Sequence, residues 1–207
     1  MSLYGDRIFP RLMDWSMSAG RVQEQRASAL LLARGDVLEI GFGTGLNLPH
    51  YPKAVTSLAA IEPGRFLTKT VEKRIADCRV PVDLMHISAE HLPWEDRRFD
   101  CIVSTWTVCT ISDPVAALRE ARRVLKPDGR FIFLEHGRSD DARIAKWQDR
   151  LNPIQRIIAC GCHFNRRIDR LILDSGFIIE RMDCYALPGI PRILGEMYRG
   201  TASAAFT

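Results

Sequence analysis

Several features that mark special classes of protein are missing from this chain of 207 residues. No apolar run approaches the roughly 20 residues needed to span a bilayer, and the first residues lack the basic start and small-residue cleavage site of a signal peptide. Basic side chains number 29 and acidic ones 25, an excess too small to require a nucleic-acid partner. Without repeats, low-complexity tracts or linkers, the sequence predicts one cytoplasmic domain over residues 1–207.

The six cysteines do not suggest a disulfide framework. They are scattered over predicted strands and helices, and thiols in a reducing compartment stay free. The tightest cluster, residues 160–163, reads Cys-Gly-Cys-His and lacks the second ligand pair of a zinc site. From the sequence we therefore expect no bound metal ion.

What the chain does have is a glycine-rich turn directly after a short buried strand. The apolar run that contains Glu39 ends at Gly41, Gly43 and Gly45, which let the backbone turn sharply and approach a ligand. A dinucleotide fingerprint, Gly-x-Gly-x-x-Gly, would need glycine at the sixth position from Gly41, where Leu46 stands. This departure and the acidic residue two places before the turn indicate S-adenosylmethionine rather than NAD.

A second strand candidate ends at Glu62, about one βαβ step after the glycine turn. A carboxylate there can accept hydrogen bonds from both ribose hydroxyls of a nucleotide cofactor. Strand and helix patterns alternate from residue 37 to about 136, which predicts a doubly wound α/β sheet with helices on both faces. Helices are expected at 66–77, 113–125 and 167–174, a later strand at 177–182, and an antiparallel last strand at 196–205.

Residues 85–93, 99–104 and 120–135 continue this pattern. In their order and spacing, the motifs closely resemble the class I S-adenosylmethionine-dependent methyltransferases. The resemblance implies a Rossmann-like sheet of seven strands, S-adenosylmethionine as cofactor and S-adenosylhomocysteine as product. It also implies a cofactor site formed by Glu39, Gly41, Gly43, Gly45, Asn47, Glu62, Pro63, Ser88, Ala89, Glu90, Thr105 and Trp106.

Within that site the resemblance implies that Glu39 binds the ammonium end of the cofactor and that Glu62 binds the ribose. It also implies that Ser88 and the backbone of Ala89 contact the adenine edge. The family more often has aspartate at the position of Ser88. Other readings stay open: Glu90 contacts adenine or caps a turn, Glu62 is a solvated strand end, and Trp106 is a pocket wall or a core side chain.

Candidate catalytic groups follow the expected fifth strand. His136 is the candidate general base, because an imidazole titrates near neutral pH; the alternative is a structural hydrogen-bonding histidine. Cys162 is a reactive thiol or an inert apolar filler. Arg166 pairs with Glu135, holds an anionic substrate, or is an ordinary surface arginine.

Across nearly the whole chain the sequence also resembles membrane-associated methyltransferase-like proteins that methylate small thiols, although it lacks their hydrophobic N-terminal anchor. The pattern comprises Tyr51-Pro52, Val108-Cys109, Glu135-His136, Trp147-Gln148, Asn152-Pro153, Gly161-Cys162, Arg166, Tyr198 and Gly200. It implies a small-molecule substrate, with hydrogen sulfide or methanethiol giving methanethiol or dimethyl sulfide. The alternatives are O-, N- or C-methylation of a lipid-like or aromatic metabolite, and a cofactor-binding regulator without turnover.

Two segments exceed the minimal fold and are expected to govern substrate choice. They are the apolar N-terminal arm, residues 1–34, and an insert after the fifth strand, residues 138–165. Sites in open α/β sheets form beyond the carboxyl ends of the strands, where insertions become lids. Plain packing of the arm against the sheet is the alternative role, and nothing in the sequence fixes an oligomeric state.

Overall fold

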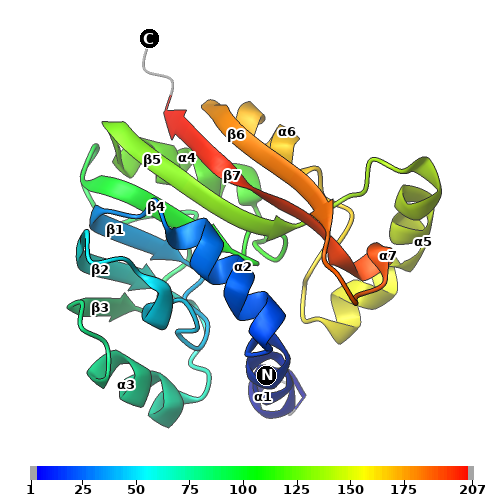
Figure 1. The fold of residues 1–207 in the computed structure, drawn as a ribbon, viewed down its shortest axis with the longest axis horizontal. Helices are drawn as coiled ribbons and strands as arrows, with labels where there is room; N and C mark the ends of the chain where they lie inside the picture. The colour runs from blue at the N-terminus through cyan, green and yellow to red at the C-terminus, as the bar shows by residue number, and fades with distance from the viewer. Residues whose placement is uncertain (1–3, 205–207) are drawn as a thin grey trace.

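The computed structural model describes residues 4–204, whose centre is a seven-stranded sheet in the order β3-β2-β1-β4-β5-β7-β6 (Figure 1). The strands are β1 (Gly35–Ile40), β2 (Val55–Ile61), β3 (Val82–Met85), β4 (Phe99–Thr105), β5 (Leu125–His136), β6 (Phe177–Ala186) and β7 (Glu196–Ala204). Strands β1 to β5 pair in parallel, whereas β7 runs antiparallel between β5 and β6. The predicted seven-stranded Rossmann-like sheet with an antiparallel last strand is confirmed.

Helical segments connect the strands. They are η1 (Tyr4–Ile8), α1 (Phe9–Met17), α2 (Gly20–Leu30), η2 (Leu48–His50), α3 (Thr68–Ala76), α4 (Pro114–Val124), α5 (Ala142–Ile158), α6 (Ile168–Asp174) and α7 (Arg192–Gly195). The start of α4 follows its sequence signal, because the Asp113 side chain accepts a hydrogen bond from the Ala116 N–H at 3.0 Å. Helix α3 begins two residues later than predicted, since Leu67 has a left-handed φ of 46° that the helix cannot include.

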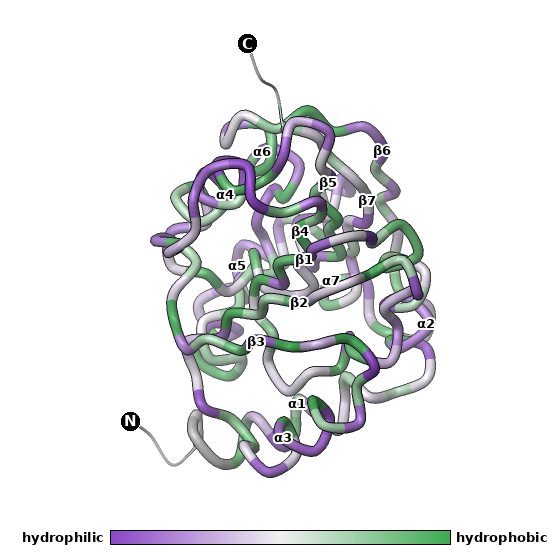
Figure 2. The backbone as a smooth tube through the Cα atoms, turned by 90° about the vertical axis from the view of Figure 1, so that its left-hand side faces the viewer, coloured by the Kyte–Doolittle hydropathy of each residue, from purple (hydrophilic) through white to green (hydrophobic). Residues whose placement is uncertain are grey.

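The sheet is covered on both faces, as a doubly wound fold requires. Alternate side chains of β5 point to opposite faces of the sheet. Phe131 and Phe133 belong to the core cluster formed with α4 and α6, and Ile132 and Leu134 belong to the one formed with α2. In Figure 1, α2 crosses the front of the sheet while α4 and α6 lie behind it. Figure 2 shows that hydrophobic residues follow the central strands and hydrophilic ones gather in the outer loops.

The parallel strands fix where the site lies. Because β1, β2, β4 and β5 run in one direction, the residues that follow them meet at a single edge of the sheet. These residues are Gly41 after β1, Glu62 after β2 and Trp106 after β4, with His136 as the last residue of β5. No helix within residues 4–204 has the length and apolar character needed to cross a bilayer.

Candidate active site

The glycine turn packs tightly on one side and is open on the other. Gly41 and Gly43 both have left-handed backbones, with φ of 77° and 57°. A Cβ on Gly41 would lie 2.1 Å from Thr107 Oγ1, whereas a Cβ on Gly43 would meet no atom within 4 Å. Gly41 therefore allows the turn to pack against the loop after β4, and the bare backbone at Gly43 borders space that a bound cofactor can fill.

Glu62 ties the end of β2 to this turn. Its Oε2 accepts a hydrogen bond from the Gly43 N–H at 2.9 Å, and its Oε1 accepts one from the Gly64 N–H at 3.0 Å. Burial raises the pKa of Glu62, and the two backbone donors oppose that shift. Each carboxylate oxygen has a further lone pair for a hydroxyl donor, so the side chain suits a ribose.

Glu39 lies at the centre of a buried polar network beneath the glycine turn. It is 1% exposed and accepts hydrogen bonds from Tyr51 Oη at 2.7 Å and Asn47 Nδ2 at 2.9 Å. Burial raises the pKa of Glu39 to about 7, against the lowering effect of the Tyr51 hydroxyl and the nearby Arg26 cation. The carboxylate is thus poised to ionise fully when a further cation approaches.

Arg26 links this network to the loop after β4. Its Nη1 donates to Asn47 Oδ1 at 2.8 Å and to Thr105 Oγ1 at 3.0 Å, and its guanidinium lies 4.7 Å from the centre of the Trp106 ring. Burial lowers the pKa of Arg26 to about 10, yet the side chain stays charged at neutral pH. The Trp106 backbone is left-handed, with φ of 53°, and its side chain is partly buried beneath this cation.

The residues expected at the adenine edge form a separate group. The Ser88 hydroxyl donates to the Glu90 carboxylate, which also accepts the Asp113 N–H at 3.4 Å in front of α4. Ala89 is buried, whereas Pro63 is exposed. Glu90 therefore holds the turn between β3 and the start of α4, and its contact with adenine stays a prediction.

Glu135 is fully buried and holds the loop between β4 and α4. Its carboxylate accepts hydrogen bonds from Ser104 Oγ at 2.7 Å, the Thr107 N–H at 3.0 Å and the Cys109 N–H at 3.4 Å. Burial raises the pKa of Glu135, while these donors lower it. The side chain therefore anchors the loop that carries Cys109.

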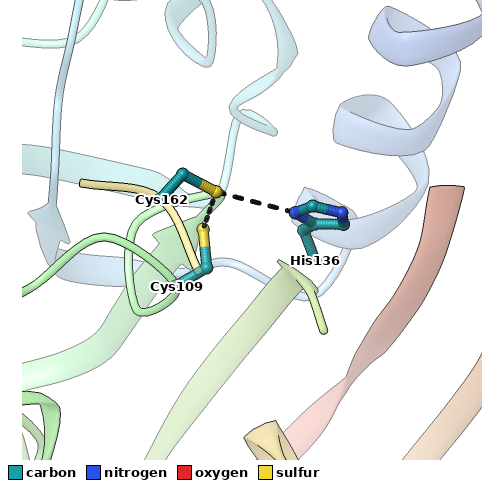
Figure 3. A group of neighbouring side chains, drawn as sticks. All are labelled: Cys109, His136 and Cys162. Atoms are coloured by element: carbon teal, nitrogen blue, oxygen red, sulfur yellow. Dashed lines mark hydrogen bonds between the residues drawn. The ribbon is translucent and has the colours of Figure 1, made fainter. Parts of the chain in front are cut away.

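Beside this anchor, Cys109, His136 and Cys162 come together from three separate segments (Figure 3). Cys162 Sγ lies 3.6 Å from Cys109 Sγ and 3.7 Å from His136 Nδ1. The contact between the two sulfurs and the neighbouring imidazole lower the pKa of Cys162, whereas the same sulfur contact and burial raise the pKa of Cys109. His136 Nε2 is buried without a partner among the described residues.

Arg166 lies next to this cluster. Its Nη1 donates to the carbonyl oxygens of Val108 at 2.5 Å and Ile111 at 2.8 Å. Burial lowers the pKa of Arg166. The guanidinium thus fixes the backbone on both sides of Cys109.

The arm and the insert both reach the site edge. Asp14 of α1 accepts a hydrogen bond from Thr44 Oγ1 of the glycine turn at 2.5 Å and pairs with Arg74 of α3 at 2.6 Å. Within the insert, Gln148 of α5 is fully buried, accepts the Ser139 N–H and donates to the Gly137 carbonyl. Both segments are therefore fastened at the carboxyl edge of the sheet.

Comparison with known proteins identifies the class that this fold and site define. A methyltransferase domain model matches residues 38–133. Among solved structures, a possible histamine N-methyltransferase from Thermotoga maritima is 22% identical, with a TM-score of 0.65 over 98% of this chain and 100% of that one. The [4+2]-cyclase SpnF is 18% identical, with a TM-score of 0.72 over 93% of this chain and 83% of that one, so the fold also occurs in an enzyme named for other chemistry.

Two curated relatives are more similar in sequence. Thiol S-methyltransferase TMT1B of Rattus norvegicus is 30% identical over 175 residues, which cover 77% of this chain and 69% of the relative. Phosphatidylethanolamine N-methyltransferase of Cereibacter sphaeroides is 29% identical over 173 residues, 81% of this chain and 84% of the relative. The chain belongs to the class I S-adenosylmethionine-dependent methyltransferases.

Three residues of the site went unassigned when the sequence was read alone. Cys109 and Tyr51 entered only as members of the family pattern without an assigned role, and Arg26 had no role in the cofactor site. A histidine and two cysteines outside any close spacing carry no local signal, since only the fold brings them together. The helical spacing of Arg26 from the apolar residues Val22, Ala29 and Leu30 was the available indication that its side chain faces inward.

Proposed function

We propose that this methyltransferase transfers a methyl group from S-adenosylmethionine to the sulfur of a small thiol, such as hydrogen sulfide or methanethiol. The observation that carries the proposal is the cluster of Cys109, His136 and Cys162 at the end of β5, which offers a compact setting for a sulfur acceptor. It adjoins the loop whose Thr107 side chain lies against Gly41 of the glycine turn. The similarity to thiol S-methyltransferase TMT1B supports the same substrate class.

In this proposal the glycine turn and its acidic neighbours hold the cofactor. The backbone at Gly41 and Gly43 supports the methionine portion, Glu39 attracts the ammonium group, and Glu62 accepts the ribose hydroxyls. Ser88 and Ala89 lie on the adenine side. When bound, S-adenosylmethionine supplies an electrophilic methyl group on a sulfonium sulfur, so the main task of the protein is to hold the acceptor in line, about 3 Å from the methyl carbon.

A labelled-cofactor assay tests this function directly. Purified protein is incubated with methyl-labelled S-adenosylmethionine and hydrogen sulfide or methanethiol, and volatile sulfide is measured in the headspace. Labelled methanethiol or dimethyl sulfide is the expected product. Cofactor binding without product from any small thiol contradicts the proposal.

His136 is proposed to take part in forming the acceptor thiolate. His136→Gln is expected to lower kcat by about 100-fold with saturating thiol, the size typical for loss of an acid–base group. Cys184→Ser, which changes an exposed thiol on β6 that is not part of the cluster, should keep wild-type kcat. An unchanged kcat in His136→Gln contradicts the assignment.

Cofactor binding should depend on pH through Glu39. Its pKa of about 7 means that much of the carboxyl is protonated below neutrality, and only the ionised form attracts an ammonium group. The Kd for S-adenosylhomocysteine is therefore expected to fall as pH rises from about 5.5 to 7.5, a range over which the ligand's own amino group stays protonated. Calorimetric titration measures this; Glu39→Gln should bind more weakly with a flat profile over that range, and a flat profile in the wild type contradicts the role.

A larger acceptor is the second candidate, and one observation favours it. Exposed apolar side chains gather on α1 and α5, with Trp15 exposed by 76%, Trp147 by 54% and Ile157 by 77%. Such surfaces suit a lipid-like or aromatic substrate, and one relative is named for phosphatidylethanolamine. Product profiling over thiol, phenol, amine and phospholipid panels separates the two candidates.

We further propose that the N-terminal arm acts as a lid over the cofactor. The hydrogen bond from Thr44 to Asp14 places α1 against the glycine turn, and Arg74 fixes the same carboxylate. Limited proteolysis with S-adenosylhomocysteine is expected to slow cleavage within residues 8–20, because a closed lid hides its backbone. Equal cleavage rates with and without the ligand contradict a lid role.

A further inference from the structure

The three side chains in Figure 3 have nearly the spacing of ligands around one metal ion. A tetrahedral zinc site, with Zn–S near 2.3 Å and Zn–N near 2.0–2.1 Å, separates two sulfurs by about 3.8 Å and a sulfur from a nitrogen by about 3.6 Å. Here the two sulfurs are 3.6 Å apart, and Cys162 Sγ is 3.7 Å from His136 Nδ1. The remaining edge, between Cys109 and His136, is no longer than 4.8 Å.

The backbone holds these ligand positions before any ion binds. The His163 N–H donates to the Cys109 carbonyl at 2.9 Å, which joins the loop of Cys162 to the loop of Cys109. Glu135 accepts the Cys109 N–H, and His136 pairs with Met197 in the sheet. Such preorganisation reduces the ordering that metal binding would otherwise require.

The chemistry of the donors indicates which ion fits. Two sulfurs and one imidazole are soft or borderline ligands, which favour zinc over calcium or magnesium. Cys109 and His136 are buried, and a divalent cation would neutralise the thiolates that burial otherwise disfavours.

We propose that Cys109, His136 and Cys162 bind a zinc ion whose fourth coordination position takes the acceptor thiol. Three protein ligands with one open position are the arrangement of catalytic zinc sites. The cluster lies close to the cofactor seat, because Thr107 contacts Gly41 and stands two residues before Cys109, a span of at most about 7 Å. This inference rests on the proposed thiol substrate.

The ion would let His136 take part in forming the acceptor thiolate as a metal ligand rather than as a free base. When the acceptor binds, its S–H bond breaks, the sulfur electron pair coordinates zinc, and the proton leaves to water. The bound sulfur keeps further lone pairs for attack on the methyl carbon. In this arrangement His136→Gln loses activity because a ligand is lost, and zinc binding falls with it.

Metal titration of the full chain tests the site. Protein stripped with a chelator is titrated with Zn²⁺, and Co²⁺ replaces it for spectroscopy, since thiolate ligands give cobalt a characteristic charge-transfer absorption. One equivalent of Zn²⁺ per chain is expected for the wild type and for the matched control Cys184→Ser. Cys109→Ser and Cys162→Ser should each weaken Zn²⁺ binding by more than about 100-fold. Loss of a residue that only hydrogen-bonds to a metal ligand typically costs about 10- to 100-fold.

The outcomes separate this inference from the proposed function. A Co²⁺ spectrum that depends on both cysteines and shifts when methanethiol is added supports the site. The inference is overturned if the wild type binds zinc no more tightly than Cys162→Ser does, or if methanethiol leaves the Co²⁺ spectrum unchanged. Headspace detection of labelled product from the same protein reports thiol methylation independently. If the protein methylates thiols without bound zinc, the metal site is contradicted and the proposed function is not.

Discussion

Replacement of Glu135 with alanine is expected to lower the melting temperature by about 6–12 °C, which corresponds to about 3 kcal/mol for a chain of this size. The carboxylate is fully buried and accepts hydrogen bonds from Ser104 Oγ and from the N–H groups of Thr107 and Cys109. Each buried donor left without an acceptor costs roughly 1–3 kcal/mol, and the lost carboxylate desolvation returns part of this. Thermal and urea unfolding measure the effect.

Ser104→Ala is the matched control for this prediction. It removes the Ser104 donor while leaving the carboxylate and its backbone donors in place. We expect a loss of about 1 kcal/mol. If Glu135→Ala is no less stable than Ser104→Ala, the carboxylate does not anchor the loop.

Gly43→Ala is expected to weaken S-adenosylhomocysteine binding at least tenfold, or about 1.4 kcal/mol, while the chain still folds. The added Cβ meets no protein atom within 4 Å, so it points into the space assigned to the cofactor. The left-handed backbone, with φ of 57°, adds a strain of about 1–2 kcal/mol to the folded state. Calorimetric titration and thermal unfolding measure the two effects separately.

Gly176→Ala is the control for backbone strain. Gly176 has φ of 86° and lies after α6, away from the glycine turn. Its variant should lose at least as much stability, because the added Cβ would also lie 3.1 Å from Arg122 Nε, but should bind S-adenosylhomocysteine as the wild type does. Wild-type affinity in Gly43→Ala would place the cofactor elsewhere.

The sheet and most helices could be predicted because their signals are local. The apolar run before Gly41, the Asp113 cap and the apolar stripe of α4 each lie within one element, where periodicity and capping determine the structure. The antiparallel last strand was also predicted, but its place between β5 and β6 depends on long-range pairing. The exact start of α3 could not be predicted, because the left-handed backbone of Leu67 does not follow from helix propensity.

The candidate site also has one part with a local sequence signal and one part that depends on long-range packing. The glycine turn and Glu62 belong to a compact βαβ unit, and their pairing through the Gly43 N–H is a short-range contact. The cluster of Cys109, His136 and Cys162 is assembled from a loop, a strand end and a second loop that only the folded sheet brings together. No spacing rule for metal ligands applies to such residues, and for that reason the sequence suggested no metal site.

The position of β7 has a consequence for synthesis of the protein. His136 and Glu135 pair with Met197 and Tyr198, so the end of β5 that carries the candidate site is flanked by the strand made last among those described. The ribosome completes the cofactor seat first and reaches β7 only several seconds later, at roughly 5–20 residues per second. Until then the nascent chain presents the free edge of β5, where a chaperone or a neighbouring nascent chain can pair with it.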